Sequence, residues 1–315
     1  MQGHSHYYFR YFIIVMISSF FLSKAAYAQK VGLVLSGGGA KGAAHIGVLK
    51  VLEENEIPID YITGTSMGAI IGAFYAAGYS PDTIESMIMD DNFQYWIDGK
   101  IPQQYRQYVD HKQPDSKWIT FDLDFDSLRN TNINTRIAND LYLNFAFNEF
   151  LAQASENANY NFDSLMIPYR AMGSEIFTEK EVPIKQGNLS RAIRASMAIP
   201  FVLDPIKING EFLYDGGIYN NFPVDVLEND FEPDVVIGSS VTQPRESPEE
   251  YDLISQVISM IQTKSNFVIK CKKNIILNTS STEVSTFAFD KAEIAIISAF
   301  GTFSAHDCTW VSNCS

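Results

Sequence analysis

A short apolar run, Val31–Leu35, is followed after Ser36 by three consecutive glycines and then by a helical pattern. A run of this length with glycine just beyond it is typical of a buried parallel strand rather than of a half-exposed one. The helical pattern covers 43–54. A second short strand at 61–63 is followed by a turn at 64–68 and a small-residue helix at 69–77. Because strands and helices alternate, we expect an α/β protein.

The same alternation returns in the second half of the chain, after an aromatic-rich stretch that follows neither period. Before that return, we expect a helix over 81–90, capped by Ser80, and a long helix over 133–151. Further strands are expected at 169–172, 182–185, 212–214, 235–238 and 274–277, and further helices at 189–197, 224–229 and 249–269. Without an internal repeat or a clear linker, this pattern predicts one domain over 29–300, with an insertion at about 91–165 and an irregular tail over 301–315.

The stretch from 93 to 125 is rich in aromatic side chains. Such side chains suit the boundary between water and acyl chains, so the stretch could form a lipid-facing cap. Burial in a second layer of the core is favoured, because large exposed apolar patches are uncommon.

The first 28 residues differ from the rest of the chain. Arg10 precedes an apolar run over 11–22, and Ala26-Tyr27-Ala28 places small residues two positions apart. This combination predicts a secretory signal peptide that is cleaved after Ala28. A retained membrane anchor is the alternative, but the run is short for a span, which needs about 20 apolar residues. We therefore expect an exported protein, located in the periplasm, in the outer membrane or outside the cell.

The charge of the chain excludes some partners. Its 37 acidic and 23 basic residues give a formal net charge of −14, and no cluster of Lys and Arg is long enough to follow a phosphate backbone. Nucleic acid is therefore not expected as a partner. Contact with an anionic membrane surface should be transient and should rest on apolar groups.

The cysteines indicate no site. Cys271, Cys308 and Cys314 all lie in the last 45 residues of the chain. Their odd number does not suit a disulfide framework, and their spacing matches no zinc motif. We assign them no chemistry.

One short motif, Gly64-Thr65-Ser66-Met67-Gly68, has the pattern Gly-x-Ser-x-Gly and lies between an expected strand and an expected helix. A nucleophilic serine in this position sits on a strained turn, and the flanking glycines keep Cβ atoms away from the crossing backbone. The free amides at the start of the following helix point toward the reacting centre. A plain connecting turn is the alternative, but the strand-turn-helix setting favours Ser66 as a nucleophile.

A serine hydroxyl needs a base, which is most often a histidine held by a carboxylate. Here His45 falls in the first helical pattern and His111 lies in the insertion. Only His306 follows a plausible acid, and it lies close to the end of the chain. A full Ser-His-Asp triad is therefore poorly supported.

A carboxylate acting alone is the other candidate. Asp215 stands at the end of an apolar strand, and Gly216 and Gly217 permit another backbone or a substrate to come close. A simple Asp-Gly hairpin turn is the competing interpretation. A carboxylate can act as the base only if a hydroxyl is held against it in a partly dehydrated cleft.

Acyl transfer also needs donors for the oxyanion, usually backbone amides. Gly37, Gly38 and Gly39 supply such amides directly after a strand, and the run continues through Lys41 and Gly42 into the first helix. Lys41 adds a cation that could steady the loop or the developing charge.

Two nucleotide-binding motifs compete for this loop. A P-loop is excluded, because Gly42 is followed by Ala43 where Lys is required. The dinucleotide fingerprint fits better, since the glycine spacing matches and Asp60 lies at about the expected distance of ~20 residues. Position argues against it, because Asp60 comes before the second strand, whereas the ribose-binding acid belongs at its far end.

Together the three motifs resemble those of the patatin-like phospholipases, in the same order. The resemblance rests on Gly37–Gly42, Gly64–Gly68 and Asp215–Gly217. The flanking segments 192–200 and 221–223 also match the family, and the resemblance covers about residues 30–240. The chain departs from the family at Lys41, where an Arg is common. Lysine keeps the charge but loses bidentate hydrogen bonding.

The resemblance implies a three-layer α/β/α fold with a mainly parallel central sheet, and hydrolysis of lipid acyl esters without a metal or cofactor. Ser66 would attack the ester carbonyl, Asp215 would accept its proton, and the amides of Gly37–Gly39 would hold the oxyanion. The supporting motif residues would be Lys41, Gly42, Gly64, Gly68, Gly216 and Gly217. The substrate would be a phospholipid or another lipid ester. The alternatives are an inactive or interaction domain of a larger outer-membrane protein and, less favoured, a dinucleotide-binding domain.

Overall fold

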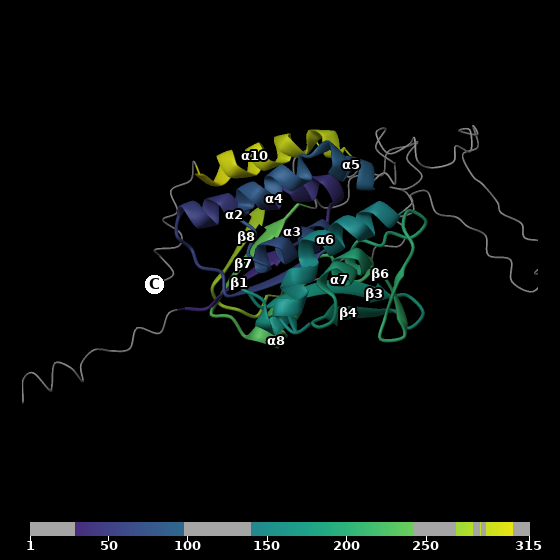
Figure 1. The fold of residues 1–315 in the computed structure, drawn as a ribbon. Coiled ribbons are helices and arrows are strands. Elements are labelled where there is room, and N and C mark those ends of the chain that lie inside the picture. Colours follow the sequence, from purple (N-terminus) through teal and green to yellow (C-terminus); the bar gives the residue numbers. More distant parts are fainter. Residues whose placement is uncertain (1–28, 98–139, 242–268, 280–283, 285–287, 305–315) are drawn as a thin grey trace, which may run out of the picture.

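The computed structural model of the chain describes residues 29–97, 140–241, 269–279, 284 and 288–304 (Figure 1). The predicted signal peptide, the greater part of the aromatic-rich stretch and nearly all of the helix predicted over 249–269 lie outside the described residues. His111, His306, Cys308 and Cys314 also lie outside them.

Within the described residues, eight strands form one central sheet. In chain order they are β1 (Val31–Leu35), β2 (Tyr61–Thr65), β3 (Tyr169–Glu175), β4 (Lys180–Ile184), β5 (Ile206–Ile208), β6 (Glu211–Asp215), β7 (Val235–Ser240) and β8 (Asn274–Asn278). The pairs β1–β2, β1–β7, β2–β3 and β7–β8 are parallel. The pairs β3–β4, β3–β6 and β5–β6 are antiparallel. The sheet is therefore mixed and mainly parallel, which confirms the prediction.

Helices cover both faces of this sheet (Figure 1). The described ones are α2 (Ala44–Glu54), α3 (Met67–Ala76), α4 (Pro81–Ile88), α5 (Asp91–Ile97), α6 (Leu141–Asn157), α7 (Leu189–Ser196), α8 (Val224–Phe231) and α10 (Ala292–Ser304), with short 3-10 turns η1 (Gly39–Ala43), η3 (Phe162–Ser164), η4 (Gly216–Ile218) and η5 (Phe289–Lys291). None of the described helices is long and apolar enough to span a bilayer.

The burial pattern of β1 shows how the layers arise. All five of its residues are buried, and alternate side chains of a strand point to opposite faces. Leu33 and Leu35 join the large core that also contains α2, α3, α7 and α10. Val34 packs instead with Leu227 of α8 in a smaller core on the other face. The fold therefore has the expected three α/β/α layers, with α8 on the opposite side of the sheet from α2 and α10 (Figure 1).

The region that begins at residue 91 starts with a helix, where the sequence predicted an irregular segment. In α5, Phe93 is 2% exposed and packs edge-on against Trp96 and Phe289. Phe289 comes from a distant part of the chain, so no local period reveals this contact. The described part of the aromatic stretch contributes Phe93 to the core, whereas Tyr95 is exposed.

Two helix ends and one strand also differ from the prediction. α6 continues to Asn157, because Leu151 and Ser155 lie one turn apart on its buried face. α10 reaches Ser304, so the first four residues of the predicted irregular tail are helical. The rest of that tail lies outside the described residues. α10 packs closely along α2, since a Cβ at Gly47 would lie 2.5 Å from the carbonyl oxygen of Ile296. The short strand β5 had not been predicted.

Candidate active site

Ser66 lies between β2 and α3 in a backbone conformation that L-residues rarely adopt. Its φ of 52° and ψ of −120° lie outside the ordinary strand and helix regions. The glycines on either side permit this turn to pass close to other backbone. A Cβ at Gly68 would lie 2.4 Å from the carbonyl oxygen of Leu35, and a Cβ at Gly64 would lie 2.5 Å from that of Gly68. The expectation of a strained turn framed by two glycines is confirmed.

The backbone amide of Ser66 is held by a second serine. It donates to Oγ of Ser196, the last residue of α7, at 3.0 Å. Thr65, the residue before the turn, donates from its hydroxyl to the carbonyl of Asn220 at 2.8 Å. The serine turn is therefore tied to two segments that follow it by more than a hundred residues.

Sheet register explains how Asp215 reaches Ser66. β4 pairs along one edge of β3, so β2 and β6 must share the other edge. β2 runs parallel to β3 and ends with Thr65 opposite Met172, whereas β6 runs antiparallel and ends with Asp215 opposite Gly173. Since Met172 and Gly173 are neighbours, about 3.3 Å apart along the strand, the ends of β2 and β6 meet. The turn after β2 and the last residue of β6 are thereby brought together.

The carboxyl group of Asp215 is buried and fixed. Asp215 is 7% exposed, its Oδ1 accepts the amide of Gly217 at 2.7 Å, and its own amide donates to the carbonyl of Ala198 at 2.9 Å. Burial raises the pKa of this carboxyl from 3.8 to about 6, and hydrogen bonds from the Gly217 amide and the Ser66 hydroxyl partly offset the rise. The carboxyl of Asp215 therefore lies beside the hydroxyl of Ser66, which favours its ionised form.

The glycine loop faces the same place. A Cβ at Gly37 would lie 3.2 Å from Cβ of Ser66 and 2.4 Å from Oδ1 of Asn221. The amide of Gly37, however, donates to the carbonyl of Asn221 at 3.2 Å. In this structure the Gly37 amide, one of the predicted oxyanion donors, is therefore engaged with Asn221. Of the three predicted donors, Gly38 and Gly39 remain, and Gly39 adopts a left-handed conformation with a φ of 57°.

The supporting motif residues surround this centre. Lys41 and Gly42 lie in η1, where a Cβ at Gly42 would lie 2.5 Å from Cγ of Met67. Gly216 passes close to β3, since its Cβ would lie 2.5 Å from the carbonyl oxygen of Met172. Gly217 contributes the amide that holds Asp215.

His45 is the only histidine among the described residues, and it does not act on Ser66. It is fully buried in α2, where its Nδ1 lies 2.7 Å from Oγ of Ser239 and its Nε2 lies 2.8 Å from the carbonyl oxygen of Ser36. Burial lowers its pKa from 6.5 to about 4, so the ring is neutral near pH 7. In the described part of the chain, the carboxyl of Asp215 rather than a histidine therefore lies beside Ser66.

Sequence reasoning missed three groups at this centre. Ser196 and Asn221 lie in segments that were noted only because they resemble the family. His45 was assigned to a helix and given no role. A buried serine at the end of a helix carries no local signal of its partner. The agreement over 192–200 and 221–223 was the one available sign that these segments return to the site.

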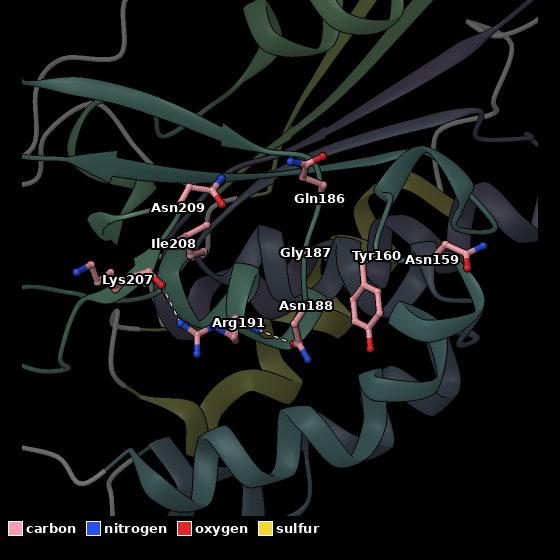
Figure 2. A pocket seen from close by; sticks show the side chains of 9 residues that line it. All are labelled: Asn159, Tyr160, Gln186, Gly187, Asn188, Arg191, Lys207, Ile208 and Asn209. Carbon is pink, nitrogen blue, oxygen red and sulfur yellow. Dashed lines mark hydrogen bonds between the residues drawn. The ribbon is translucent and has the colours of Figure 1, made fainter.

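A surface hollow of about 440 Å³ lies at the opposite end of α7 from Ser196 (Figure 2). Arg191 crosses it, with Nη2 donating to the carbonyl of Lys207 at 2.8 Å and the backbone amide donating to Oδ1 of Asn188 at 3.1 Å. None of the lining residues is Asp, Glu, His, Ser or Cys, so the hollow contains neither a serine nucleophile nor a carboxylate or histidine base. These residues are Asn159, Tyr160, Gln186, Gly187, Asn188, Arg191, Lys207, Ile208 and Asn209.

The described residues offer no metal site. In the part of the chain that the structure describes, no three His, Cys, Asp or Glu side chains are grouped to hold an ion. Cys271 is a free, partly buried thiol, 3.2 Å from the carbonyl oxygen of Lys273.

Comparison with known proteins identifies relatives for most of this domain. Residues 33–228 match the family model described as patatin-like phospholipase. The chain is 30% identical over 210 residues to the patatin-like phospholipase domain-containing protein ZK370.4 of Caenorhabditis elegans, which covers 66% of this chain and 13% of that protein. It is 29% identical over 223 residues to lysophospholipase NTE1 of Cryptococcus neoformans, covering 71% of this chain and 12% of the relative. The chain thus matches only about an eighth of the length of these relatives.

Among solved structures, VipD from Legionella pneumophila aligns with a TM-score of 0.46 at 13% identity, covering 90% of this chain and 67% of VipD.

Proposed function

The chain belongs to the patatin-like phospholipase family, and from that premise we propose that it hydrolyses carboxylic ester bonds of lipids, with Ser66 as nucleophile and Asp215 as base. The observation that carries this proposal is that the register of β2 and β6 on β3 brings the strained Ser66 turn and the buried Asp215 carboxyl together. A carboxylate with an ordinary pKa is too weak a base to activate a hydroxyl efficiently at neutral pH. Burial supports this role by raising the pKa of Asp215 to about 6.

The reaction would proceed in two halves. As Ser66 Oγ attacks the ester carbonyl, its proton passes to Asp215, and a tetrahedral oxyanion forms. The amides of Gly38 and Gly39 are the proposed donors to that oxyanion, since the amide of Gly37 is already used by Asn221. Collapse of the oxyanion breaks the ester C–O bond, and the leaving alcohol takes the proton from Asp215. This leaves Ser66 acylated.

Water completes the cycle. Asp215, again ionised, would accept a proton from a water molecule that attacks the acyl-serine. The second oxyanion collapses with cleavage of the bond to Ser66 Oγ, which recovers its proton from Asp215. The fatty acid is released, and the side chains return to their starting state without a metal or cofactor.

For the substrate we propose a phospholipid or lysophospholipid, a class that the names of the relatives support. Contact with a membrane surface would be transient, because a chain with a net charge of −14 is repelled by anionic lipids. We also propose that the protein is exported, on the basis of the signal-peptide pattern that ends at Ala28.

Covalent labelling tests the proposed function directly. A fluorophosphonate probe should label the full chain, and Ser66→Ala should abolish both labelling and the release of fatty acid from lysophospholipid micelles. Ser190→Ala is the matched control, because Ser190 is also buried but bonds to Asn148 and Asn188 rather than to the site. The proposal would be contradicted if the probe did not label the wild-type chain, or if it still labelled the Ser66→Ala chain.

A further inference from the structure

His45 is buried directly behind the glycine loop and has a partner on each ring nitrogen. Its Nε2 lies 2.8 Å from the carbonyl oxygen of Ser36, and its Nδ1 lies 2.7 Å from Oγ of Ser239. All three residues are completely shielded from solvent. The proposed reaction leaves this group without a role.

The chemistry of the two partners determines which nitrogen carries the proton. A carbonyl oxygen can only accept a hydrogen bond, so Nε2 must be the protonated nitrogen. In a neutral ring Nδ1 is then an acceptor, and the hydroxyl of Ser239 must donate to it. Burial, which lowers the pKa of His45 to about 4, agrees with a neutral ring.

The carbonyl that His45 holds belongs to the peptide unit that opens the glycine loop. The other end of that peptide unit is the amide of Gly37, which donates to the carbonyl of Asn221 at 3.2 Å. Ser36 is fixed further, because its amide donates to the carbonyl of Ser239 at 3.1 Å and its Oγ accepts the amide of Val241 at 3.0 Å. A peptide plane held at both ends cannot rotate, so it sets the direction in which the next amides point.

We propose that His45 is a positioning residue, which as a neutral imidazole protonated on Nε2 orients the Ser36–Gly37 peptide and so aims the amides of Gly38 and Gly39 at the reacting carbonyl beside Ser66. The kinetic part of this inference rests on the proposed ester hydrolysis. Its structural part, the state of the ring, does not. His45 takes no part in proton transfer, since both its nitrogens are committed to fixed partners.

Nuclear magnetic resonance tests the state of the ring without any catalysis. In full-length protein labelled with ¹⁵N-histidine, at about pH 7, long-range ¹H–¹⁵N spectra should show one buried ring as the neutral tautomer with the proton on Nε2. The signals that vanish in His45→Gln identify that ring. A proton on Nδ1, or a charged ring, would overturn the inference.

Kinetics test the positioning role. His45→Leu removes the donor to Ser36 and should lower kcat by about tenfold or more with little change in KM, because the oxyanion is held only in the transition state. His45→Gln offers an amide N–H to the same carbonyl and should recover most of kcat. A wild-type kcat in His45→Leu, or an equal loss in both variants, contradicts the role.

Two controls separate this inference from other failures. Ser155→Ala removes another buried hydroxyl, one that bonds to Leu151 and Leu189 away from the site, and should leave kcat unchanged. If His45→Leu does not fold, the tautomer measurement on the wild-type chain still decides the assignment of the ring. Activity that survives in Ser66→Ala would refute the proposed function. The ring spectrum would still test the tautomer of His45, because that measurement does not depend on activity.

Discussion

The amide of Ser66 donates a 3.0 Å hydrogen bond to Oγ of Ser196, a residue 130 positions later in the chain. This bond links the strained turn after β2 to the C-terminal end of α7. It also commits the Ser66 amide, which is therefore no donor to an oxyanion. Ser196 thus supports the orientation of the proposed nucleophile from a helix that carries none of the proposed reacting groups.

Replacing Ser196 tests that support. Ser196→Ala leaves a buried amide without a partner, which costs about 1–3 kcal/mol, and frees the turn to relax. We expect kcat to fall about tenfold while KM changes little, measured as fatty-acid release against substrate concentration. Ser190→Ala, in the same helix, should keep kcat at the wild-type level. Equal loss of kcat in both variants would show that α7 acts only through stability.

Asp215→Asn should stop turnover. Asparagine keeps the size of the side chain and the acceptor for Gly217, but it cannot accept the proton of Ser66. We expect kcat to fall by about 10³-fold or more, as for other residues that act as a unit with a nucleophile. His306→Ala is the comparison. Should His306→Ala abolish turnover while Asp215→Asn retains it, a triad would replace the pair.

The rate should depend on the ionisation of Asp215. Only the carboxylate form can accept a proton, so kcat/KM should rise with pH and level off above an apparent pKa of about 6. The measurement is ester hydrolysis between about pH 4.5 and 8.5. A rise centred near the ordinary pKa of a carboxyl group, about 4, would contradict burial as the cause of the activation.

The same burial should make the free energy of unfolding fall as pH rises, whereas the rate of hydrolysis rises. The pKa of Asp215 rises on folding from 3.8 to about 6, so the folded state binds the proton more tightly than the unfolded state. The free energy of unfolding should therefore fall as pH rises through this window, by up to about 3 kcal/mol at 1.36 kcal/mol per unit. Asp215→Asn, which carries no charge, should exceed the wild-type chain in stability at about pH 7.5 and match it near pH 4 in urea denaturation. Equal stability of the two chains at both pH values would mean that Asp215 is not dehydrated.

Gly68 and Gly301 form a matched pair for the close approach at the serine turn. A Cβ at Gly68 would lie 2.4 and 2.5 Å from the carbonyl oxygens of Leu35 and Ser36, which are backbone atoms that cannot move aside. We expect Gly68→Ala to lower the free energy of unfolding by about 3 kcal/mol. Gly301, exposed in α10, has nothing within 4 Å, so Gly301→Ala should raise it by about 0.5–1 kcal/mol. Tolerance of Gly68→Ala would mean that the turn and β1 are not in contact.

Local patterns were enough for the elements whose own side chains form the core. β1 covers the predicted residues, and Ser80 caps α4 by accepting the amide of Thr83. The strand predicted at 61–63 extends through Thr65, because the glycine that indicated a turn still pairs in β2 opposite Leu35. In such cases hydrophobic period and turn chemistry reflect the final fold.

Other features depend on contacts that no local pattern contains. α5 is stabilised by Phe289, and the orientation of the Gly37 amide is set by Asn221, 184 positions away. The sequence could therefore indicate that a glycine loop, a serine turn and an acidic strand end form one site. It could not indicate which of the three glycine amides bonds to Asn221, because peptide orientation is decided by the tertiary structure.

The head-on arrival of β2 and β6 at one edge of β3 has a consequence for the order of events in the cell. A ribosome that has just made Ser66 must add 149 more residues before Asp215 exists. A nascent chain thus carries the serine long before its proposed acidic partner. Under the proposed mechanism, ester cleavage requires that β6 has paired with β3, so activity would report that this late pairing has formed.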